Sequence, residues 1–287
     1  MKPEPLRRSQ PRMGTIVTLL VAGSTESRSN QEAAIDRAFG WFAQVEEICT
    51  RFDPESELMR LCRQTDTPIA VSRILFEAVR FALDLAAESH GAFDPTVGAE
   101  MTSRGFNRNY ASGLRVESAA GSNAVNYRDV VLNAANQTIQ LKRPLVLDLG
   151  AVAKGMAVDL AAHELEELKN FSIDAGGDLY LGGVNPEGEP WRIGIRHPRQ
   201  PDSIIDVIRV SDRAVCTSGD YERQSASGDL HIVDPRQNKS AAEAASATVV
   251  APSAMLADGV ATAAFVLGPE KGIDLLERLE IDGLIIT

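Results

Sequence analysis

Two residues near the C-terminal end of the chain, Asp258 and Thr262, are of types that bind metal ions and are spaced four apart. They lie in an alanine-rich segment, residues 253–266, whose apolar pattern predicts a buried helix. On a helix, residues four apart share a face, so this spacing brings a carboxylate and a hydroxyl together. Hard oxygen ligands of this kind suit Mg²⁺, which often shares its coordination shell with substrate phosphates. The alternative is that Asp258 caps the helix and Thr262 packs inside it.

A second stretch, residues 147–159, combines an acid, small residues and a lysine. The apolar residues Val146, Leu147 and Leu149, which surround Asp148, predict the end of a buried strand. A helix is expected to begin near Ala151. Unpaired amides at a helix start attract phosphate, and Lys154 would add a cation beside them. Gly150 and Gly155 would let another group approach the backbone closely. An ordinary strand-to-helix connection with a surface lysine remains the alternative reading.

Three further groups carry side chains that could do chemistry. Residues 174–178, Asp-Ala-Gly-Gly-Asp, form a glycine bend between two predicted strands. The turn at Thr217, Ser218 and Gly219 could hold a phosphate or a ring carbonyl, or could be a plain capped turn. His231 is followed closely by Asp234, and a histidine of ordinary pKa suits general-base work, although a lone histidine is more often a structural residue. Cys216 with His231 would make a cysteine hydrolase, but no activating context for the thiol is visible.

Composition limits the classes of partner. The chain has 287 residues, a net charge of −11 and 24% charged residues. Because binding to a nucleic acid backbone needs clustered cations, we expect no nucleic acid partner. The three cysteines form no C-x-x-C pair, and no apolar run reaches the length of a membrane span. Basic residues precede the apolar run 16–22, which we interpret as a first β-strand rather than a leader. A cytoplasmic protein is expected, or an exported one if a leader was removed.

The remaining elements predict an α+β fold. Helices are expected over residues 31–48, 74–89 and 270–279, with a stop at Gly268-Pro269. Strands are expected over 69–71, 130–132, 138–141, 171–183 (interrupted by the glycine bend), 191–195, 204–210, 214–218, 247–251 and 284–286, with another ending at 231–235. Strands and helices do not alternate regularly, which favours α+β over a doubly wound sheet. No linker is evident, so we expect one domain over residues 1–287, or two intertwined subdomains.

Taken together, these motifs resemble the ApbE family of FAD:protein FMN transferases. The matching stretches follow one another along nearly the whole chain: residues 12–15, 52–61, 91–98, 147–159, 174–178, 191–198, 217–223, 231–236 and 257–268. The resemblance implies an α+β fold related to the T-fold, with mixed and antiparallel sheets flanked by helices. It also implies a reaction in which FAD and Mg²⁺ bind, FMN passes to a Thr or Ser hydroxyl of an acceptor flavoprotein, and AMP is released. Some members of the family instead hydrolyse FAD to FMN and AMP.

The same resemblance implies a role for each matching residue. Asp258, Thr262 and the carbonyl of Ala151 correspond to the metal ligands, and His231, Asp258 and Lys154 to the catalytic group, with His231 as the base for the acceptor hydroxyl. The positions that correspond to the nucleotide site are Met13, Cys62, Asp94, Asp148, Lys154, Asp174, Gly176, Gly177, Thr217, Ser218, Gly219 and Asp234.

The sequence departs from the family pattern at a few positions. Cys62 occupies a position where the family usually has an Asn that contacts adenine. Met156 replaces a usual Tyr. Asn238 stands where the family normally has a Gly after the Asp-Pro-Arg turn, residues 234–236. The Cys62 departure keeps two alternatives open, namely FAD binding without catalysis and hydrolysis of FAD without protein flavinylation.

Overall fold

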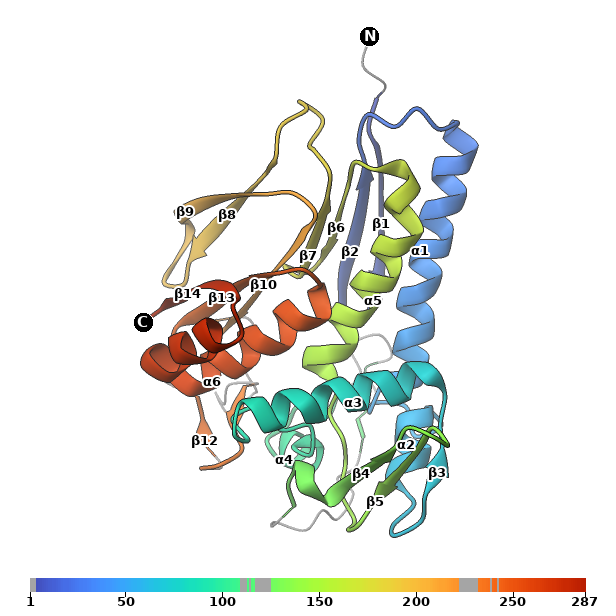
Figure 1. The fold of residues 1–287 in the computed structure, drawn as a ribbon, viewed down its shortest axis with the longest axis vertical. Coiled ribbons are helices and arrows are strands. Elements are labelled where there is room, and N and C mark those ends of the chain that lie inside the picture. The colour runs from blue at the N-terminus through green and yellow to red at the C-terminus, as the bar shows by residue number, and fades with distance from the viewer. Residues whose placement is uncertain are drawn as a thin grey trace.

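A computed structural model describes residues 4–108, 113, 115–116, 125–221, 232–237, 239–241 and 243–287 (Figure 1). Its centre is a seven-stranded antiparallel sheet with the order β1-β2-β6-β7-β10-β13-β14. The strands are β1 (Leu6–Arg12), β2 (Thr15–Val21), β6 (Phe171–Ala175), β7 (Leu179–Gly182), β10 (Arg213–Gly219), β13 (Ser246–Ala251) and β14 (Asp282–Ile286).

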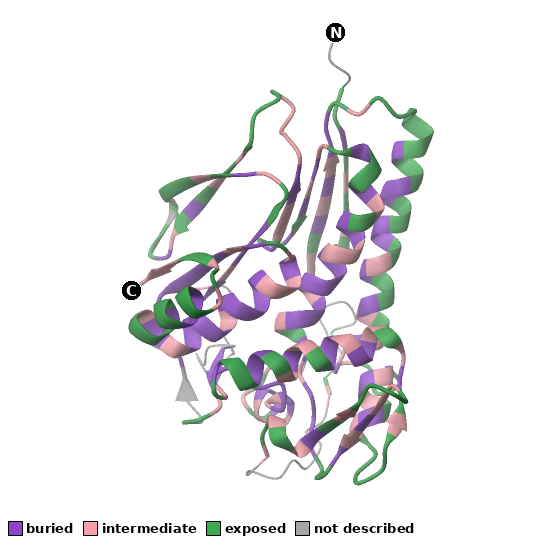
Figure 2. Cartoon of the chain, in the orientation of Figure 1, coloured by how far each residue is buried: buried purple, intermediate pink, exposed green. Residues whose placement is uncertain are grey.

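Three long helices cover one face of this sheet (Figure 1). They are α1 (Arg28–Cys49), α5 (Gly150–Leu165) and α6 (Ala254–Arg278). Helix α5 packs against both α1 and α6, and α6 packs across β10, β13 and β14. Side chains of α5 and of the first half of α6 are buried on most sides, as Figure 2 shows, because each helix lies between the sheet and further helices. The main hydrophobic core therefore lies between the sheet and this helical layer.

The rest of the chain forms smaller elements around this centre. Helix α3 (Arg73–Glu88) packs against α1, α5 and α6. A three-stranded sheet joins β3 (Ile69–Ala70), β5 (Thr138–Leu141) and β4 (Val130–Asn133), and β8 (Trp191–His197) pairs with β9 (Gln200–Val210) in a separate hairpin. The short elements are α2 (Glu57–Cys62), α4 (Gly98–Ser103), η1 (Tyr127–Asp129), η2 (Glu166–Leu168), β11 (Val233–Asp234) and β12 (Lys239–Ser240).

Most predicted elements are confirmed, including the break at Gly268. The segment that contains α6 leaves helical geometry at this glycine, whose φ is 78° and ψ −178°, and Pro269 follows it. A positive φ costs glycine little, so this position ends one helix and allows the next to start. None of the helices in the described part of the chain combines the length and apolar composition that a membrane crossing needs.

The structure corrects two predictions. The strand that was expected to be the first, over residues 16–22, is β2. The basic segment before it is β1, which pairs with β2 through a turn at Met13 and Gly14. It escaped prediction because Leu6 is its one buried residue and the others are exposed or intermediate, as expected of an edge strand. Residues 146–149 form no strand: Val146 makes a single parallel bridge to Val97, after which the chain enters α5.

Helices α5 and α6 approach most closely at Gly155. A Cβ atom placed on this glycine would lie 2.5 Å from the carbonyl oxygen of Ala254 and 2.5 Å from the Cα of Met255. Asp159, one turn further along α5, accepts hydrogen bonds from the amides of Ala254 at 2.6 Å and Met255 at 2.9 Å. The close approach predicted at this glycine is therefore confirmed, and the approaching group is the start of α6.

We expect Gly155→Ala to lower the free energy of unfolding by about 1–3 kcal/mol, because the added methyl group meets backbone atoms that cannot move independently. Gly40→Ala is the matched control: Gly40 also lies within a helix, and nothing stands within 4 Å of an added Cβ. This control should raise stability by about 0.5–1 kcal/mol through helix propensity. Urea denaturation of both variants is the measurement, and equal stabilisation of the two would contradict the close packing.

Candidate active site

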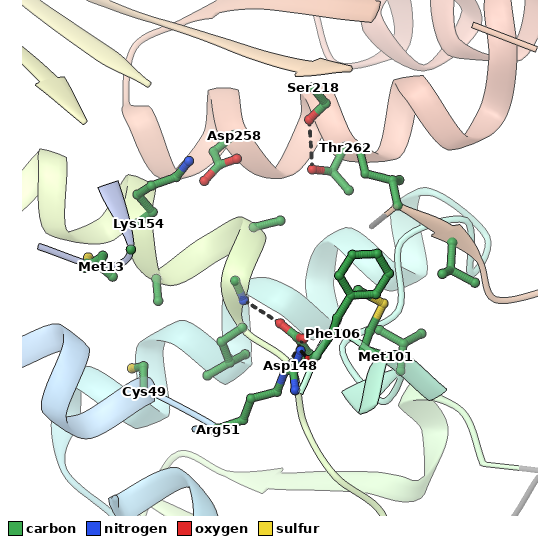
Figure 3. Close-up of a pocket in the computed structure, with 18 of the residues that line it drawn as sticks. Met13, Cys49, Arg51, Met101, Phe106, Asp148, Lys154, Ser218, Asp258 and Thr262 are labelled. Atoms are coloured by element: carbon green, nitrogen blue, oxygen red, sulfur yellow. Dashed lines mark hydrogen bonds and ion pairs between the residues drawn. The ribbon is translucent and has the colours of Figure 1, made fainter. Parts of the chain in front are cut away.

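A cavity of about 1080 Å³ opens where the ends of the sheet strands meet α5, α6 and the loops near α4 (Figure 3). The residues that line it come from every part of the chain. Ten of the residues predicted for the site are among them: Met13, Asp94, Asp148, Ala151, Lys154, Gly176, Thr217, Ser218, Asp258 and Thr262.

A charged cluster lies on one wall of the cavity. Lys154 of α5 forms an ion pair with Asp178, whose side chain is 3% exposed, and Asp258 of α6 is also buried. Burial alone would lower the pKa of Lys154, but the carboxylates of Asp178 and Asp258 outweigh burial and raise that pKa above its ordinary value. Lys154 is therefore a cation, placed beside the side chains of Asp178 and Asp258.

Asp258 and Thr262 line the same cavity, as the predicted helical face requires (Figure 3). The residue that caps α6 is Ser253, whose hydroxyl accepts the amide of Leu256 at 3.3 Å, so the alternative reading of Asp258 as a cap is wrong. Thr262 Oγ1 lies 3.1 Å from Ser218 Oγ of β10, within hydrogen-bond distance. Within the described residues, no three His, Cys, Asp or Glu side chains gather into a metal site; the expected ligand set contains a single carboxylate.

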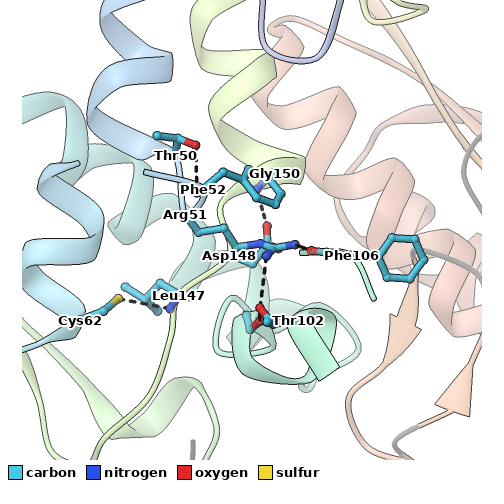
Figure 4. A network of polar contacts seen from close by, with 10 residues as sticks. Thr50, Arg51, Phe52, Cys62, Thr102, Phe106, Leu147, Asp148 and Gly150 are labelled. Carbon is cyan, nitrogen blue, oxygen red and sulfur yellow. Dashed lines mark hydrogen bonds and ion pairs between the residues drawn. The ribbon is translucent and has the colours of Figure 1, made fainter. Parts of the chain in front are cut away.

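A second polar network holds the opposite wall together (Figure 4). The Arg51 side chain is 7% exposed, and its Nε donates to Asp148 Oδ2 at 2.6 Å. Its other nitrogens donate to Thr102 Oγ1 at 3.3 Å and to the carbonyl of Phe106 at 2.6 Å. One guanidinium therefore joins the end of α1, helix α4 with the segment after it, and the segment that starts α5.

The start of α5 differs from the predicted phosphate site. The amide of Gly150 donates to Asp148 Oδ1 at 2.8 Å, and those of Val152 and Ala153 donate to the carbonyl of Leu149 at 3.0 and 2.8 Å. Three amides at this helix start already have acceptors within the protein, which corrects the expectation that they point outward to a ligand. Of the features predicted for a phosphate site here, Lys154 and the backbone that lines the cavity are the ones that could still bind an anion.

Five predicted residues lie outside the cavity lining and have structural partners, namely Cys62, Asp174, Gly177, Gly219 and Asp234. Cys62 Sγ accepts the amide of Leu147 at 3.4 Å, and burial raises the pKa of its thiol to about 11. Asp174 Oδ1 accepts the amide of Gly177 at 2.9 Å and closes the glycine bend. An added Cβ on Gly219 would meet the Tyr221 ring, and Asp234 pairs with Arg236 at 2.8 Å. His231 and Asn238 lie outside the described residues.

The buried thiol of Cys216 argues against a cysteine hydrolase. Its side chain is 0% exposed, and it is absent from the cavity lining. Burial, followed by the charges of Asp178 and Asp258, raises the pKa of this thiol well above its ordinary value. A nucleophilic cysteine needs the thiolate form and access to substrate, and this side chain has neither.

Comparison with known proteins identifies the chain's relatives. A model of the ApbE family matches residues 13–285. The chain belongs to the ApbE family. It is 32% identical to the FAD:protein FMN transferase of Vibrio cholerae serotype O1, over 99% of this chain and 88% of that protein. The protein of the same name from Treponema pallidum is 31% identical, over 96% of this chain and 82% of its own length.

Solved structures of ApbE proteins share the fold. The ApbE protein of Thermotoga maritima superposes with a TM-score of 0.84 at 29% identity, over 98% of this chain and 94% of that one. The flavin transferase ApbE of Vibrio cholerae gives 0.81 at 30% identity, over 98% and 93%. The predicted family and its α+β fold are thereby confirmed, and the shared name of the curated relatives makes this chain a transferase.

Several residues that line the cavity were not predicted from the sequence. Arg51 immediately precedes a stretch that matches the family, but nothing in the sequence separates a buried arginine from an exposed one. Arg108, Arg115 and Arg196 also line the cavity, all of them exposed. The first two lie in an irregular segment without periodicity, and Arg196 alternates in a strand like any surface residue.

We expect Arg51→Met to lower the free energy of unfolding by about 3–5 kcal/mol, since it leaves the Asp148 carboxylate partly buried without its cation. The matched control is Arg80→Met, which breaks an exposed pair with Glu77 on α3 and should cost about 0.2–1 kcal/mol. Thermal unfolding followed by circular dichroism compares them. An equal loss of stability in Arg51→Met and Arg80→Met would mean that the Arg51 network does not stabilise the cavity wall.

Proposed function

We propose that this protein transfers FMN from FAD to a Thr or Ser hydroxyl of an acceptor flavoprotein in a Mg²⁺-dependent reaction that releases AMP. The observation that carries the proposal is the pair Asp258 and Thr262, which face one large cavity next to Lys154. The name shared by the relatives, FAD:protein FMN transferase, supports the substrate and the kind of acceptor.

The size of the cavity agrees with a dinucleotide substrate. Sites for drug-sized ligands measure about 300–1,000 Å³, and this one, at about 1080 Å³, is slightly larger than that range. It extends from the wall at Asp258 to the wall at Asp148, so the two halves of a dinucleotide have separate regions to occupy.

The donor set fits magnesium. Asp258 supplies a carboxylate oxygen, Thr262 a hydroxyl oxygen and Ala151 a backbone carbonyl, all of them hard ligands. Asp178, which lines the cavity beside Lys154, adds a second acidic side chain near Asp258, and acidic side chains attract a divalent cation. When bound, the ion would neutralise charge on the pyrophosphate, which a protein of net charge −11 otherwise repels.

The residues of the chain supply position and charge. Lys154, fixed as a cation by Asp178, would stabilise the negative charge that develops on the phosphoryl oxygens. His231 would take the proton of the acceptor hydroxyl as its oxygen bonds to the phosphorus of the FMN half. The bond between this phosphorus and the bridging oxygen then breaks, AMP leaves with that oxygen, and a phosphodiester remains on the acceptor.

Hydrolysis of FAD is the second candidate, and Cys62 is the observation that favours it. At this position the resemblance calls for an Asn that contacts adenine, whereas the neutral Cys62 thiol binds a backbone amide outside the cavity lining. If the protein holds adenine less firmly, water would attack the phosphorus of the FMN half in place of the acceptor hydroxyl, and the same bond would break. Incubation with FAD and Mg²⁺ distinguishes the outcomes: AMP without acceptor indicates hydrolysis, and flavin fluorescence on a denatured acceptor indicates transfer.

Asp258→Asn and Thr262→Ala should each weaken Mg²⁺ binding by at least the roughly 10- to 100-fold that loss of a side chain behind a metal ligand costs, and should lower AMP release correspondingly. Asp274→Asn is the matched control, since Asp274 lies on the same helical segment but is exposed and outside the cavity. Calorimetric titration with Mg²⁺ and chromatography of AMP are the two measurements. Unchanged Mg²⁺ affinity in Asp258→Asn would overturn the metal assignment.

His231→Ala should lower the rate of transfer to an acceptor by about 10²–10⁴-fold, the usual contribution of a general base, while FAD affinity stays within twofold. The control is His163→Ala, because His163 is exposed on α5 and pairs with Glu166 on the surface. Flavin fluorescence quenching gives the affinity, and in-gel fluorescence gives the rate. Equal transfer by both variants would exclude His231 as the base.

A further inference from the structure

The β8–β9 hairpin has one face packed against the sheet and one face open to solvent. Trp191, Ile193 and Ile208 of the inner face pack against a small apolar cluster that includes Leu181 and Val215. The indole nitrogen of Trp191 also donates to the carbonyl of Gly182 at 3.0 Å. The hairpin is therefore held to β7 and β10, next to the sheet in Figure 1.

The outer face carries arginines and exposed aliphatic residues in alternation. The pairs Arg192↔Arg209, Gly194↔Val207 and Arg196↔Ile204 face each other across the two strands. Ile204 is 62% exposed and Val207 42% exposed, and the Ile204 side chain lies over Gly194, 2.9 Å from where a Cβ would stand. We call this set the outer hairpin face.

Charge distinguishes this face from the rest of the protein. Residues 191–210 contain four arginines and two aspartates, a net charge of +2, whereas the whole chain carries −11. Within the described residues, no carboxylate pairs with Arg192, Arg196 or Arg209. Like charges directly opposite in a sheet are destabilising, so Arg192 and Arg209 work against the hairpin that carries them.

The outer hairpin face is continuous with the candidate active site. Arg196 belongs to this face and also lines the cavity. Beside it, Arg199 makes a two-pronged ion pair with Asp220 at 2.6 and 2.7 Å, which ties the hairpin turn to the residue that follows β10. Arg192 is four residues from Arg196, or about 13 Å along an extended strand, so the face extends well beyond a substrate held in the cavity.

We propose that the outer hairpin face is where the acceptor protein docks, through a segment that carries acidic and apolar side chains beside its reactive hydroxyl. The inference rests on the proposed function, because an acceptor hydroxyl must enter the cavity whose edge Arg196 forms. Unpaired arginines complement acidic side chains, and the exposed Ile204 and Val207 offer apolar contact between them. A protein partner, unlike a small substrate, would contact both the arginines and the exposed aliphatic side chains, which extend away from the cavity.

The test uses the double variant Arg192→Glu with Arg209→Glu, which reverses the charge but keeps a like-charged pair across the strands. The probe is a purified flavoprotein that the wild-type protein labels covalently with FAD and Mg²⁺. We expect KM for this acceptor to rise about tenfold, with kcat, FAD affinity and acceptor-free AMP release unchanged, since charges at an interface rim act mainly on association. Ile204→Ser with Val207→Ser should raise the same KM.

The control is Arg7→Glu with Arg28→Glu, an equal change of charge at exposed positions outside the cavity lining. Replacing the acidic residues that neighbour the acceptor hydroxyl with lysine should restore a low KM in the charge-reversed variant alone. Equal KM values for wild type, hairpin variants and control would overturn docking at this face while leaving the proposed function intact. Absence of any labelled acceptor with the wild-type protein would overturn the proposed function, and docking with it.

Two other occupants of the face predict different results. Binding to anionic phosphatidylglycerol vesicles that the charge reversal abolishes, with an unchanged KM for acceptor, would mean a membrane contact and would refute the proposal. A dimer in light scattering that the reversal dissociates, again with an unchanged KM, would mean self-association and would refute it equally.

Discussion

The contact between α5 and α6 at Gly155 is the constraint on which the candidate site depends. Only a residue without a side chain lets the start of α6 come within 2.5 Å of the Cβ position on α5. Asp159 fixes the same contact by accepting the first two amides of α6. Burial raises the pKa of Asp159 to about 6, against the opposing effect of these amides, so near neutral pH it is chiefly the carboxylate that receives them. Lys154 precedes the crossing glycine, and the crossing brings it to Asp258 on the neighbouring helix.

The cations that line the cavity compensate for the acidic character of the protein. An acidic protein that is to hold an anionic dinucleotide needs local positive charge, and the described cations of the cavity are arranged in two ways. Lys154 and Arg51 are enclosed and neutralised in part by Asp178 and Asp148, which fixes their positions. The arginines at residues 108, 115 and 196 are exposed, and attract charge at longer range. Enclosed cations orient a substrate, whereas exposed ones raise the rate at which charged partners arrive.

Sequence patterns located the parts of the site that follow local rules. The spacing of Asp258 and Thr262 needed only helical geometry, and the helix that carries them is where its apolar pattern predicted it. Gly155 was correctly seen as a point of close approach, but local sequence does not say whether a ligand or a second helix approaches. The same ambiguity affected the start of α5, whose amides bind Asp148 and Leu149 rather than a phosphate. Arg51 escaped prediction because its partner Asp148 is 97 residues away in the chain, and β1 because, among the described strands, β2 alone pairs with it, which leaves it at the edge of the sheet.

Transfer and hydrolysis of FAD break the same bond, and the oxygen that attacks the phosphorus is all that separates them. In the proposed reaction, residues deep in the cavity, such as Asp258 and Lys154, would act on the bond that breaks and would serve transfer and hydrolysis equally. Under this proposal the choice of nucleophile would be made where the acceptor enters, which we have proposed to be the edge formed by Arg196 and the hairpin. A hydroxyl delivered by a docked segment competes with water through its high effective concentration, because binding supplies the entropy that a free encounter lacks. If the acceptor docks there, selectivity for protein over water would depend on the surface at the mouth of the cavity rather than on the charged cluster inside.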